Sequence, residues 1–566
     1  MHLSRRTFMQ QVVAAVAGGA IGRQLQAKTP SRRAGQVVAA AAGAAIGRRL
    51  HAKTPSPSAE PAARPNVVVI LADDLGWGDL NCYNPDGMIP TPNLDVLARQ
   101  GMRFTDAHTP AAQCSPTRYG LMTGRYAWRT RMKTGVLQHF ARPLIAKKRL
   151  TLASLLKRHG YATAGIGKWH LGLGWQTKPG QTIKPTSWDA RQVDKIDFTK
   201  PLTAGPLDHG FDYYFGIGSS NNMLPYCYIE GHRVVQPPTT QRKSPVYDTE
   251  TGVGLVSPDY VSEQIDQVLW TKAKSWLDKH FKTTPDKPFF LYLPTSAIHR
   301  PCLAVKAFRN KSKAGLHGDK VVELDDIVGK LMAMLKAKGC QDNTLVIFTS
   351  DNGAMPGDPE RALQHYARHD WGKRWDARKL LARKNEGTFR NWLTYGHKVN
   401  GPYLGYKTTI YEGGHRVPFI VRWPGKVKAG SVSDEIICVV DVLATVAEIL
   451  EVDLPKNAAE DSYSILPVLL GRKLNAPLRE ATIMTPWSTM KSVRQGPWKL
   501  IMGPDAGGFR MGRKVKTAGQ LYNLAADPGE TTNLYDRHPE KVKALTAIYE
   551  KYAAAGRSAP PAKFAR

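Results

Sequence analysis

Short apolar runs alternate with amphipathic stretches between residues 66 and 425, and this alternation limits the folds that the chain can adopt. Residues 67–72 form a continuous apolar, β-branched run, as in a strand buried on both faces, and further strands are predicted at 162–166, 289–293, 345–349 and 417–423. Apolar residues at helical spacing predict helices at 93–100 (with Asn93 as its cap), 151–159, 258–281 and 319–338. Strands that alternate with helices favour an α/β fold, here a large, mostly parallel sheet sandwiched by helices.

The pattern of predicted elements changes near residue 470, which indicates a second, smaller domain. Beyond it, short strand-like runs at 481–484 and 498–501 precede a helix at 539–553. The 566 residues are enough for one large α/β domain and a smaller one. We therefore predict a main domain at 65–470 and a C-terminal α+β subdomain at 471–566.

The first 64 residues have the pattern of an export signal. Paired arginines at 5–6 precede Phe8 and a mild apolar run, which matches a twin-arginine signal. The run is too short and too rich in alanine and glycine to anchor the chain in a bilayer. Residues 31–56 nearly repeat residues 4–31, so we expect a duplicated leader and linker at 1–64. This pattern predicts a bacterial protein that uses the export machinery, is periplasmic or extracellular, and has no transmembrane anchor. The alternative is a basic amphipathic tail without an export function.

The strongly positive charge of the chain implies an anionic partner. The formal charge is +32; the leader holds ten basic residues and one acidic residue (+9), and the remainder holds 69 basic and 46 acidic residues (+23). Nucleic acid, acidic glycans and membrane surfaces all suit a body this basic, and charge alone does not choose among them. A basic, aromatic-rich insert at 355–400 suits sulfated sugars or nucleic acid, unless its aromatic residues are core.

Acidic residues directly follow two of the predicted strands. Asp73 and Asp74 follow the first strand, and Asp351 and Asn352 follow the fourth. Adjacent carboxylates repel each other unless a cation balances them. Hard oxygen ligands suit Ca²⁺ or Mg²⁺ rather than zinc. Either pair alone is more often a solvated turn, but ligands of parallel sheets sit beyond the carboxyl ends of the strands, so the two pairs together predict one divalent-cation site.

Cys114 stands in a motif that distinguishes it from an ordinary cysteine. The six cysteines form no CxxC pair, which argues against structural zinc, and a lone cysteine is usually a small buried hydrophobe. The stretch CSPTRYGLMTGRY, however, resembles the sulfatase signature, in which C-x-P-x-R directs oxidation of the cysteine to formylglycine. All three fixed positions are present, as Cys114, Pro116 and Arg118.

Further stretches carry the same resemblance in the same order. They are NVVVILADDLGWGD (66–79), GKWHLG (167–172), SAIHRP (296–301), TLVIFTSDNG (344–353), GYKTTIYEGGHRVPFIVRWPG (405–425) and LYNLAADPGETTNL (521–534). The resemblance is closest to the arylsulfatase A-like branch of the family, within the alkaline-phosphatase-like superfamily. It implies a sulfuric ester hydrolase that acts on a sulfated carbohydrate or another sulfate ester, with a formylglycine-generating enzyme as a partner.

The resemblance also implies a role for each site residue. Calcium, in preference to magnesium, is expected between Asp73, Asp74, Asp351, Asn352 and the 3-oxoalanine (formylglycine) made from Cys114. The hydrated aldehyde offers one hydroxyl to attack sulfur and a second that later helps to expel sulfate. By the same resemblance, Arg118 and Lys168 orient the formylglycine, and His170 assists recovery of the aldehyde. The sulfate is bound by Lys168, Ser220, His299 and Lys407. Either His299 or Lys407 protonates the leaving oxygen. His299 stands in IHRP, where the family more often has PHxP.

Two other interpretations stay open from the sequence. Relatives of this fold and nucleophile include phosphonate and phosphate-ester hydrolases. The other interpretation is a non-catalytic, polyanion-binding protein in which Cys114 is unmodified and the lysines and histidines are ordinary surface or core residues. Nucleic acid is not expected as the partner, because no recognised binding motif accompanies the charge.

Overall fold

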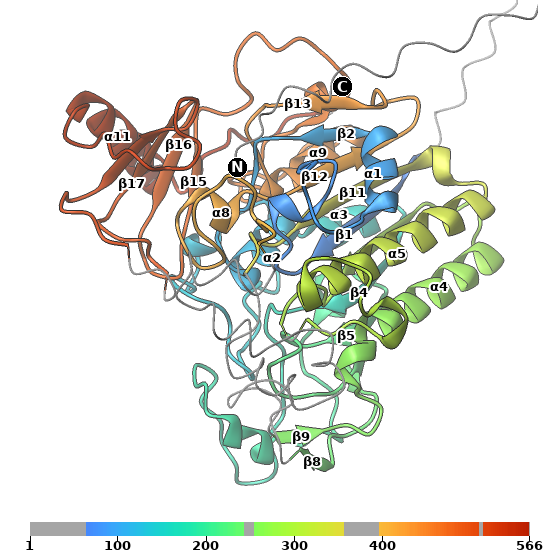
Figure 1. Cartoon of the computed structure of the whole chain (residues 1–566). Coiled ribbons are helices and arrows are strands. Elements are labelled where there is room, and N and C mark those ends of the chain that lie inside the picture. Colours follow the sequence, from blue (N-terminus) through green and yellow to red (C-terminus); the bar gives the residue numbers. More distant parts are fainter. Residues whose placement is uncertain (1–63, 243–253, 301, 356–395, 509–512, 565–566) are drawn as a thin grey trace, which may run out of the picture. The chain divides into compact units, whose positions relative to one another are not determined.

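A ten-stranded sheet forms the centre of the structure and joins the segments that carry the predicted site residues (Figure 1). The computed structural model describes residues 64–242, 254–300, 302–355, 396–508 and 513–564. The predicted leader, apart from Arg64, and residues 356–395 of the basic insert lie outside the described residues. Within the described ranges no helix is long and apolar enough to cross a membrane.

The centre of the sheet is parallel and its edges are mixed. In order across the sheet, the strands are β13 (Ser431–Ser433), β2 (Met102–Phe104), β12 (Phe419–Arg422), β11 (Thr344–Ser350), β1 (Asn66–Ala72), β10 (Phe289–Pro294), β4 (Ala162–Lys168), β5 (Tyr213–Ile217), β6 (Ile229–Glu230) and β7 (Arg233–Val234). Every pair from β11 to β5 is parallel. Antiparallel pairs join β12 to β11 and β2 on one side, and β5, β6 and β7 on the other. The predicted large, mostly parallel sheet is confirmed.

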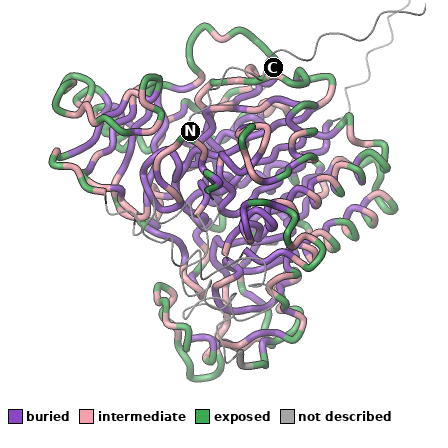
Figure 2. The backbone as a smooth tube through the Cα atoms, viewed as in Figure 1, coloured by how far each residue is buried: buried purple, intermediate pink, exposed green. Residues whose placement is uncertain are grey.

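Helices cover both faces of this sheet, and the alternation of side chains along β1 shows why. Val67, Val69 and Leu71 join one core, whereas Val68, Ile70 and Ala72 join the other, because successive side chains of a strand point to opposite faces. The first core includes α2 (Cys114–Thr123), α3 (Leu152–Arg158), α9 (Val442–Ile449) and α10 (Leu466–Leu469). The second includes α1 (Pro92–Arg99), α4 (Ile265–Thr283) and α5 (Gly315–Ala337). Figure 2 shows the central strands buried between these layers.

Three predicted helix starts differ from the structure. The helix predicted at 319–338 begins earlier, at Gly315, and the other two differ for identifiable reasons. The helix predicted at 93–100 begins at Pro92, because proline lacks the N–H that the first helical position would leave unpaired. Asn93 is therefore not the cap, and its side-chain amide donates to Asp325 at 2.8 Å instead. The helix predicted at 258–281 begins at Ile265, because Tyr260 packs against other tyrosine rings outside the helix.

A second sheet of four antiparallel strands forms near the C-terminus. Its strands are β15 (Thr482–Met484), β16 (Ser492–Gln495), β17 (Trp498–Ile501) and β18 (Gln520–Asn523). Leu545, Ile548 and Tyr552 of α11 (Pro539–Ala555) pack on it. The predicted α+β character of this region is confirmed, and a boundary at residue 470 stays a prediction. Two-stranded sheets pair β3 (Ala107–His108) with β14 (Ile437–Cys438) and β8 (Thr240–Arg242) with β9 (Gly254–Val256).

A buried ionic network joins the C-terminal sheet to the short helix α8 (Glu412–His415). Lys499 Nζ of β17 lies 3.0 Å from Glu412 Oε1 and 2.9 Å from Glu530 Oε1, and all three side chains are fully buried. His415 Nε2 lies 3.1 Å from the same Nζ atom. Buried charges are tolerated only when they are paired, so Lys499 balances carboxylates from two other segments.

Replacing Lys499 with methionine is expected to lower the free energy of unfolding by about 3–5 kcal/mol, the usual cost of removing one partner from a buried ion pair. Methionine fills a similar volume but leaves the Glu412 and Glu530 carboxylates facing each other without the ammonium group. Urea unfolding of the purified protein measures the change. The matched control is Lys543→Met on the exposed side of α11, which should leave the unfolding curve unchanged. Equal curves for the two variants would contradict the prediction.

Candidate active site

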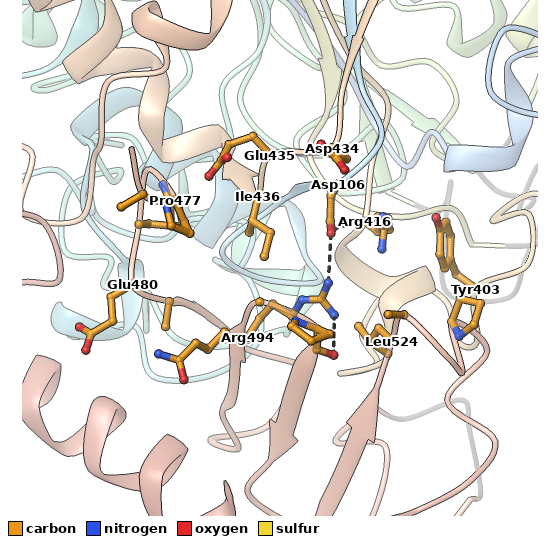
Figure 3. A pocket seen from close by; sticks show the side chains of 18 residues that line it. Asp106, Tyr403, Arg416, Asp434, Glu435, Ile436, Pro477, Glu480, Arg494 and Leu524 are labelled. Atoms are coloured by element: carbon orange, nitrogen blue, oxygen red, sulfur yellow. Dashed lines mark hydrogen bonds and ion pairs between the residues drawn. The ribbon is translucent and has the colours of Figure 1, made fainter. Parts of the chain in front are cut away.

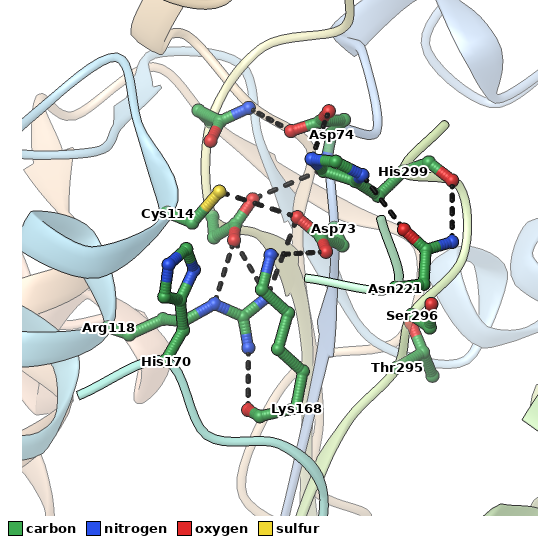
Figure 4. A network of polar contacts seen from close by, with 12 residues as sticks. Asp73, Asp74, Cys114, Arg118, Lys168, His170, Asn221, Thr295, Ser296 and His299 are labelled. Carbon is green, nitrogen blue, oxygen red and sulfur yellow. Dashed lines mark hydrogen bonds and ion pairs between the residues drawn. The ribbon is translucent and has the colours of Figure 1, made fainter. Parts of the chain in front are cut away.

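The parallel strands bring several of the predicted residues to one edge of the sheet (Figure 4). Asp73 and Asp74 follow β1, and Asp351 follows β11. Lys168 is the last residue of β4, and His299 lies in the loop after β10. Parallel neighbours end at the same edge, so side chains far apart in the sequence become neighbours in space.

Cys114 reaches this edge as the first residue of α2. The residue is 1% exposed. Its Sγ atom lies 3.7 Å from Asp73 Oδ1 and 3.3 Å from Lys407 Nζ. Lys407 comes from the loop before α8, so the site also draws on segments that do not belong to the sheet. The orphan N–H groups at the start of a helix favour negative charge on an atom at this position.

Three buried carboxylates and three buried cations balance one another in the site. Each acid has one close cationic partner: Asp73 Oδ2 lies 2.6 Å from Lys168 Nζ, Asp74 Oδ1 lies 2.6 Å from Lys407 Nζ, and Asp351 Oδ2 lies 2.7 Å from Arg118 Nη2. Arg118 also donates from Nη1 to the main-chain oxygen of Lys168 at 2.9 Å, which ties α2 to the end of β4. The formal charge of these six groups is zero (−3 and +3).

The carboxyl groups differ in proton affinity although they are neighbours. Burial alone would raise the pKa of Asp74, but Lys407, His299 and Lys168 hold it well below the usual range. Burial and the neighbouring Asp73 charge raise the pKa of Asp351 to about 6. Asp351 therefore takes up a proton more readily than Asp74, which suits a proton acceptor.

Burial also raises the pKa of the Cys114 thiol, to about 12, despite the opposing effect of Lys168 and Lys407. A thiol with such a pKa is almost fully protonated at neutral pH, and the thiolate is the reactive form of cysteine. Unmodified Cys114 is thus a poor nucleophile in this environment.

The donor atoms of the site fit a hard divalent cation. Ligand atoms of Asp73, Asp74, Cys114 and His299 lie within 4.8 Å of one another. Asn352 donates from Nδ2 to Asp74 Oδ1 at 2.8 Å, and its Oδ1 atom is buried without a hydrogen-bond partner among the described residues. A buried carbonyl oxygen beside three carboxylates is the donor set that calcium prefers.

Both predicted histidines of the site are buried, and burial followed by nearby lysine charge lowers the pKa of each well below its ordinary value. The main-chain carbonyl oxygen of Leu137 lies 3.1 Å from His170 Nε2, and this hydrogen bond orients the ring. His170 Nδ1 has no partner within the described part of the chain. His170 and Asp74 both have positive φ values, of 55° and 64°. Non-glycine residues in this region are strained, and such residues often cluster at functional sites.

His299 has a neighbour that the sequence did not identify. Asn221 Oδ1 lies 3.0 Å from His299 Nδ1, and Asn221 Nδ2 donates to the main-chain oxygen of His299 at 3.2 Å. Ser220 is buried in the same loop, and its main-chain carbonyl accepts from Met223. The position of Asn221 directly after Ser220 was the only available signal, because a lone asparagine in a loop is uninformative.

A separate cavity lies beside the C-terminal sheet (Figure 3). It measures about 940 Å³, and its lining includes Asp106, Tyr403, Arg416, Glu435 and Arg494. Two of its arginines are paired with acids, Arg416 with Glu412 at 3.0 Å and Arg494 with Asp106 at 3.1 Å. None of the predicted site residues lines this cavity.

Comparison with known proteins identifies two family models along the chain. The model described as sulfatase matches residues 65–452. The model described as N-sulphoglucosamine sulphohydrolase, C-terminal, matches residues 404–553. Together these matches cover the main sheet, the candidate site and the C-terminal sheet.

Individual relatives match over most of the chain. An N-acetylgalactosamine-6-O-sulfatase from Bacteroides thetaiotaomicron is 33% identical over 525 residues, which cover 86% of this chain and 93% of the relative. Human N-acetylgalactosamine-6-sulfatase is 28% identical, with 86% and 84% covered. A solved sulfatase structure, described with glycosaminoglycan metabolism by Bacteroides thetaiotaomicron, is 31% identical with a TM-score of 0.70, and 87% of this chain and 99% of that chain are covered.

Proposed function

The chain belongs to the sulfatase family and is a sulfuric ester hydrolase, and from this premise we propose that its nucleophile is formylglycine made from Cys114. The single observation that carries the proposal is the convergence of Cys114 with Asp73, Asp74 and Lys407 in one buried cluster. The raised pKa of the Cys114 thiol supports it, since the unmodified side chain is poorly suited to attack. A hydrated aldehyde at this position supplies a hydroxyl nucleophile and a second hydroxyl that helps to release sulfate.

Asp73, Asp74, Asp351 and Asn352 would hold a calcium ion together with modified Cys114. Such an ion supplies positive charge that lowers the pKa of a bound hydroxyl and attracts the sulfate oxygens. The six charged side chains of the site are already balanced, so a divalent ion would leave the site positive and suited to an anionic ester. The Asn352 Oδ1 atom, which has no partner in the part of the chain that the structure describes, supports this assignment.

The remaining side chains are proposed to bind the sulfate and move protons. Lys168 and Lys407, with Ser220 and His299, would contact the sulfate oxygens and offset charge in the transition state. Arg118 and Lys168 would orient the formylglycine, and Asp351 would accept a proton from its attacking hydroxyl. His170, whose Nδ1 atom has no partner among the described residues, would assist aldehyde recovery, and either His299 or Lys407 would protonate the leaving oxygen.

The proposed substrate is a sulfated carbohydrate, and a 6-O-sulfated N-acetylgalactosamine unit is the first choice. Two relatives that match over 86% of the chain are named for this ester. The excess of positive charge outside the leader suits a polyanionic glycan. The twin-arginine pattern at the N-terminus supports export to the compartment in which such polymers are met.

The test compares sulfate release from 6-sulfated and 4-sulfated N-acetylgalactosamine with hydrolysis of 4-nitrophenyl sulfate and bis(4-nitrophenyl) phosphate. We expect kcat/KM for the aryl sulfate to exceed that for the phosphate diester by about 100-fold or more, and the 6-sulfated sugar to be cleaved faster than the 4-sulfated sugar. Faster cleavage of the phosphate diester would favour a phosphate-ester hydrolase. Activity on none of the four compounds would favour a polyanion-binding protein.

A further inference from the structure

We propose that Trp188 is a binding surface for the sugar ring that adjoins the sulfated unit, so that the substrate is a glycan chain and not a free monosaccharide. Trp188 directly precedes Asp189, the cap of the short helical turn Ala190–Lys195, and is 47% exposed. The inference rests on the proposed sulfatase reaction and adds a second binding subsite to it.

The indole ring of Trp188 is not part of the two hydrophobic cores that flank the main sheet. Its ring contact is with His139: the two ring centroids lie 5.7 Å apart, and the ring planes meet at 82°. An edge-to-face contact of this kind orients the indole ring and covers at most one of its faces. Single exposed apolar side chains are common, so the position of this ring, and not its exposure alone, must identify a binding site.

His139 connects the indole ring to two segments that line the active site. It comes two residues after Leu137, whose N–H donates to Ser115 Oγ at 3.1 Å and whose carbonyl oxygen lies 3.1 Å from His170 Nε2. Ser115 directly follows the proposed nucleophile. The imidazole of His139 also lies beside the main chain of Leu224, in the loop that carries the predicted sulfate-binding serine. One aromatic ring therefore separates the indole from both segments.

The loop that carries Trp188 is held by its own polar contacts. The side chain of Gln192 spans the loop: it accepts from the N–H of Lys184 and donates to the carbonyl oxygen of Lys184 at 3.2 Å. The N–H of Asp189 donates to Ser187 Oγ at 3.0 Å. A ring on a loop that is already ordered loses little conformational entropy when a ligand binds to it, which favours binding.

The depth of the site places the adjoining sugar ring near the surface. Cys114, His299 and Lys407 are 1%, 6% and 7% exposed, so the sulfate binds in a buried position and the sugar that carries it must extend outward. The next ring of the chain then lies outside the buried cluster, where an exposed aromatic face can meet it.

The chemistry of a pyranose ring matches such a face. When its hydroxyl groups are equatorial, each face of the ring presents C–H groups, while the hydroxyl, carboxylate and sulfate groups point outward from the ring edge. The face of an indole ring carries negative partial charge and attracts the hydrogens of polarised C–H bonds. The ring can therefore bind the indole while its polar groups stay in water.

The test compares Trp188→Ala with the wild type on three sulfate esters. They are 6-sulfated N-acetylgalactosamine, a trisaccharide with this unit at its non-reducing end, and 4-nitrophenyl sulfate. We expect KM for the trisaccharide to rise by about tenfold with kcat unchanged, because the lost contact is made equally in the ground state and the transition state. KM for the other two esters should change by at most about twofold, because neither has a second ring.

Two further variants separate loss of the aromatic face from a general effect. Trp188→Phe keeps a smaller aromatic face and should retain most of the affinity for the trisaccharide. Val432→Ala removes an exposed apolar side chain, 51% exposed on the edge strand β13, and should match the wild type on all three esters. Should Trp188→Ala unfold at a lower temperature than the wild type, Trp188→Gln, which keeps a long side chain without an aromatic face, repeats the comparison.

An unchanged KM for the trisaccharide, or equal changes on all three esters, would overturn the inference and leave the sulfatase reaction in place. Equal kcat/KM of the wild type for the monosaccharide and the trisaccharide would overturn it as well. A wild type without activity on any sulfate ester would instead overturn the proposed function.

Discussion

Replacing Cys114 with alanine is expected to lower kcat/KM for a sulfate ester by about 10⁴-fold or more, because the variant has no side chain that can become the covalent nucleophile. The thiol sulfur lies 3.7 Å from Asp73 Oδ1 and 3.3 Å from Lys407 Nζ, so this side chain contacts the other groups of the site directly. Residual activity above about 1% of wild type would be too high for a lost nucleophile and would contradict the assignment.

The same prediction has a readout that does not depend on turnover. Conversion of the thiol to an aldehyde lowers the mass of tryptic peptide 104–118 by about 18 Da, and mass spectrometry of the active protein measures the shift. The matched control is Cys340→Ala in the turn after α5, where the cysteine is half-buried and donates to the main-chain oxygen of Leu335. This variant should keep both the modified peptide and wild-type activity.

Removal of the divalent ion is expected to lower kcat/KM by about 100-fold or more. Without the ion, the attacking hydroxyl loses the positive charge that lowers its pKa, and effects of this kind on proton transfer are usually of this size. It should also lower thermal stability, because three carboxylates in the site are fully or nearly fully buried. At a free calcium concentration 100-fold above Kd, binding contributes about 2.7 kcal/mol to the free energy of unfolding. Dialysis against a chelator, followed by calorimetry and rate assays with added Ca²⁺ or Mg²⁺, measures both effects.

A carboxylate-to-amide pair provides the control for the metal prediction. Asp351→Asn keeps the shape of a ligand but removes its charge. We expect calcium affinity to fall by about 100-fold, the upper end of the cost of losing a residue that supports a metal ligand. Asp342→Asn lies on the surface, with a side chain that is 76% exposed, and should bind calcium as the wild type does. Full activity of the chelated protein, with no calcium uptake by titration calorimetry, would contradict the assignment.

The centre of the fold and half of the site were predictable from the sequence because both follow from strand pattern. The runs before Asp73 and Asp351 are mostly apolar, as is typical of strands buried on both faces, and their pairing in parallel brings both acids to one edge. Cys114 and Lys407 lie on no central strand, and only their surrounding motifs pointed to them. Periodicity alone would have left both residues out.

Other features depend on tertiary contacts that no local pattern records. The strand at Phe419–Arg422 is antiparallel to its neighbour, and its own apolar residues do not indicate which direction it takes. Asn221 has meaning only because the loop after β5 lies beside His299, which is 78 positions away. From the sequence, Lys499 would be expected on the surface, but in the structure it is buried and paired with Glu412 and Glu530.

The pairing of Lys499 with Glu412 has a consequence for how the gene tolerates damage. Every residue assigned to the chemistry precedes position 410, yet a premature stop codon between Glu412 and Lys499 would keep that carboxylate and remove the ammonium group that neutralises it. The main-chain hydrogen bonds between the segment before Cys114 and the residue after β15 would be lost as well: Ala112 donates to Thr485, and Thr485 donates to Pro110. Nonsense alleles should therefore be inactive even when the entire set of reacting groups is still encoded.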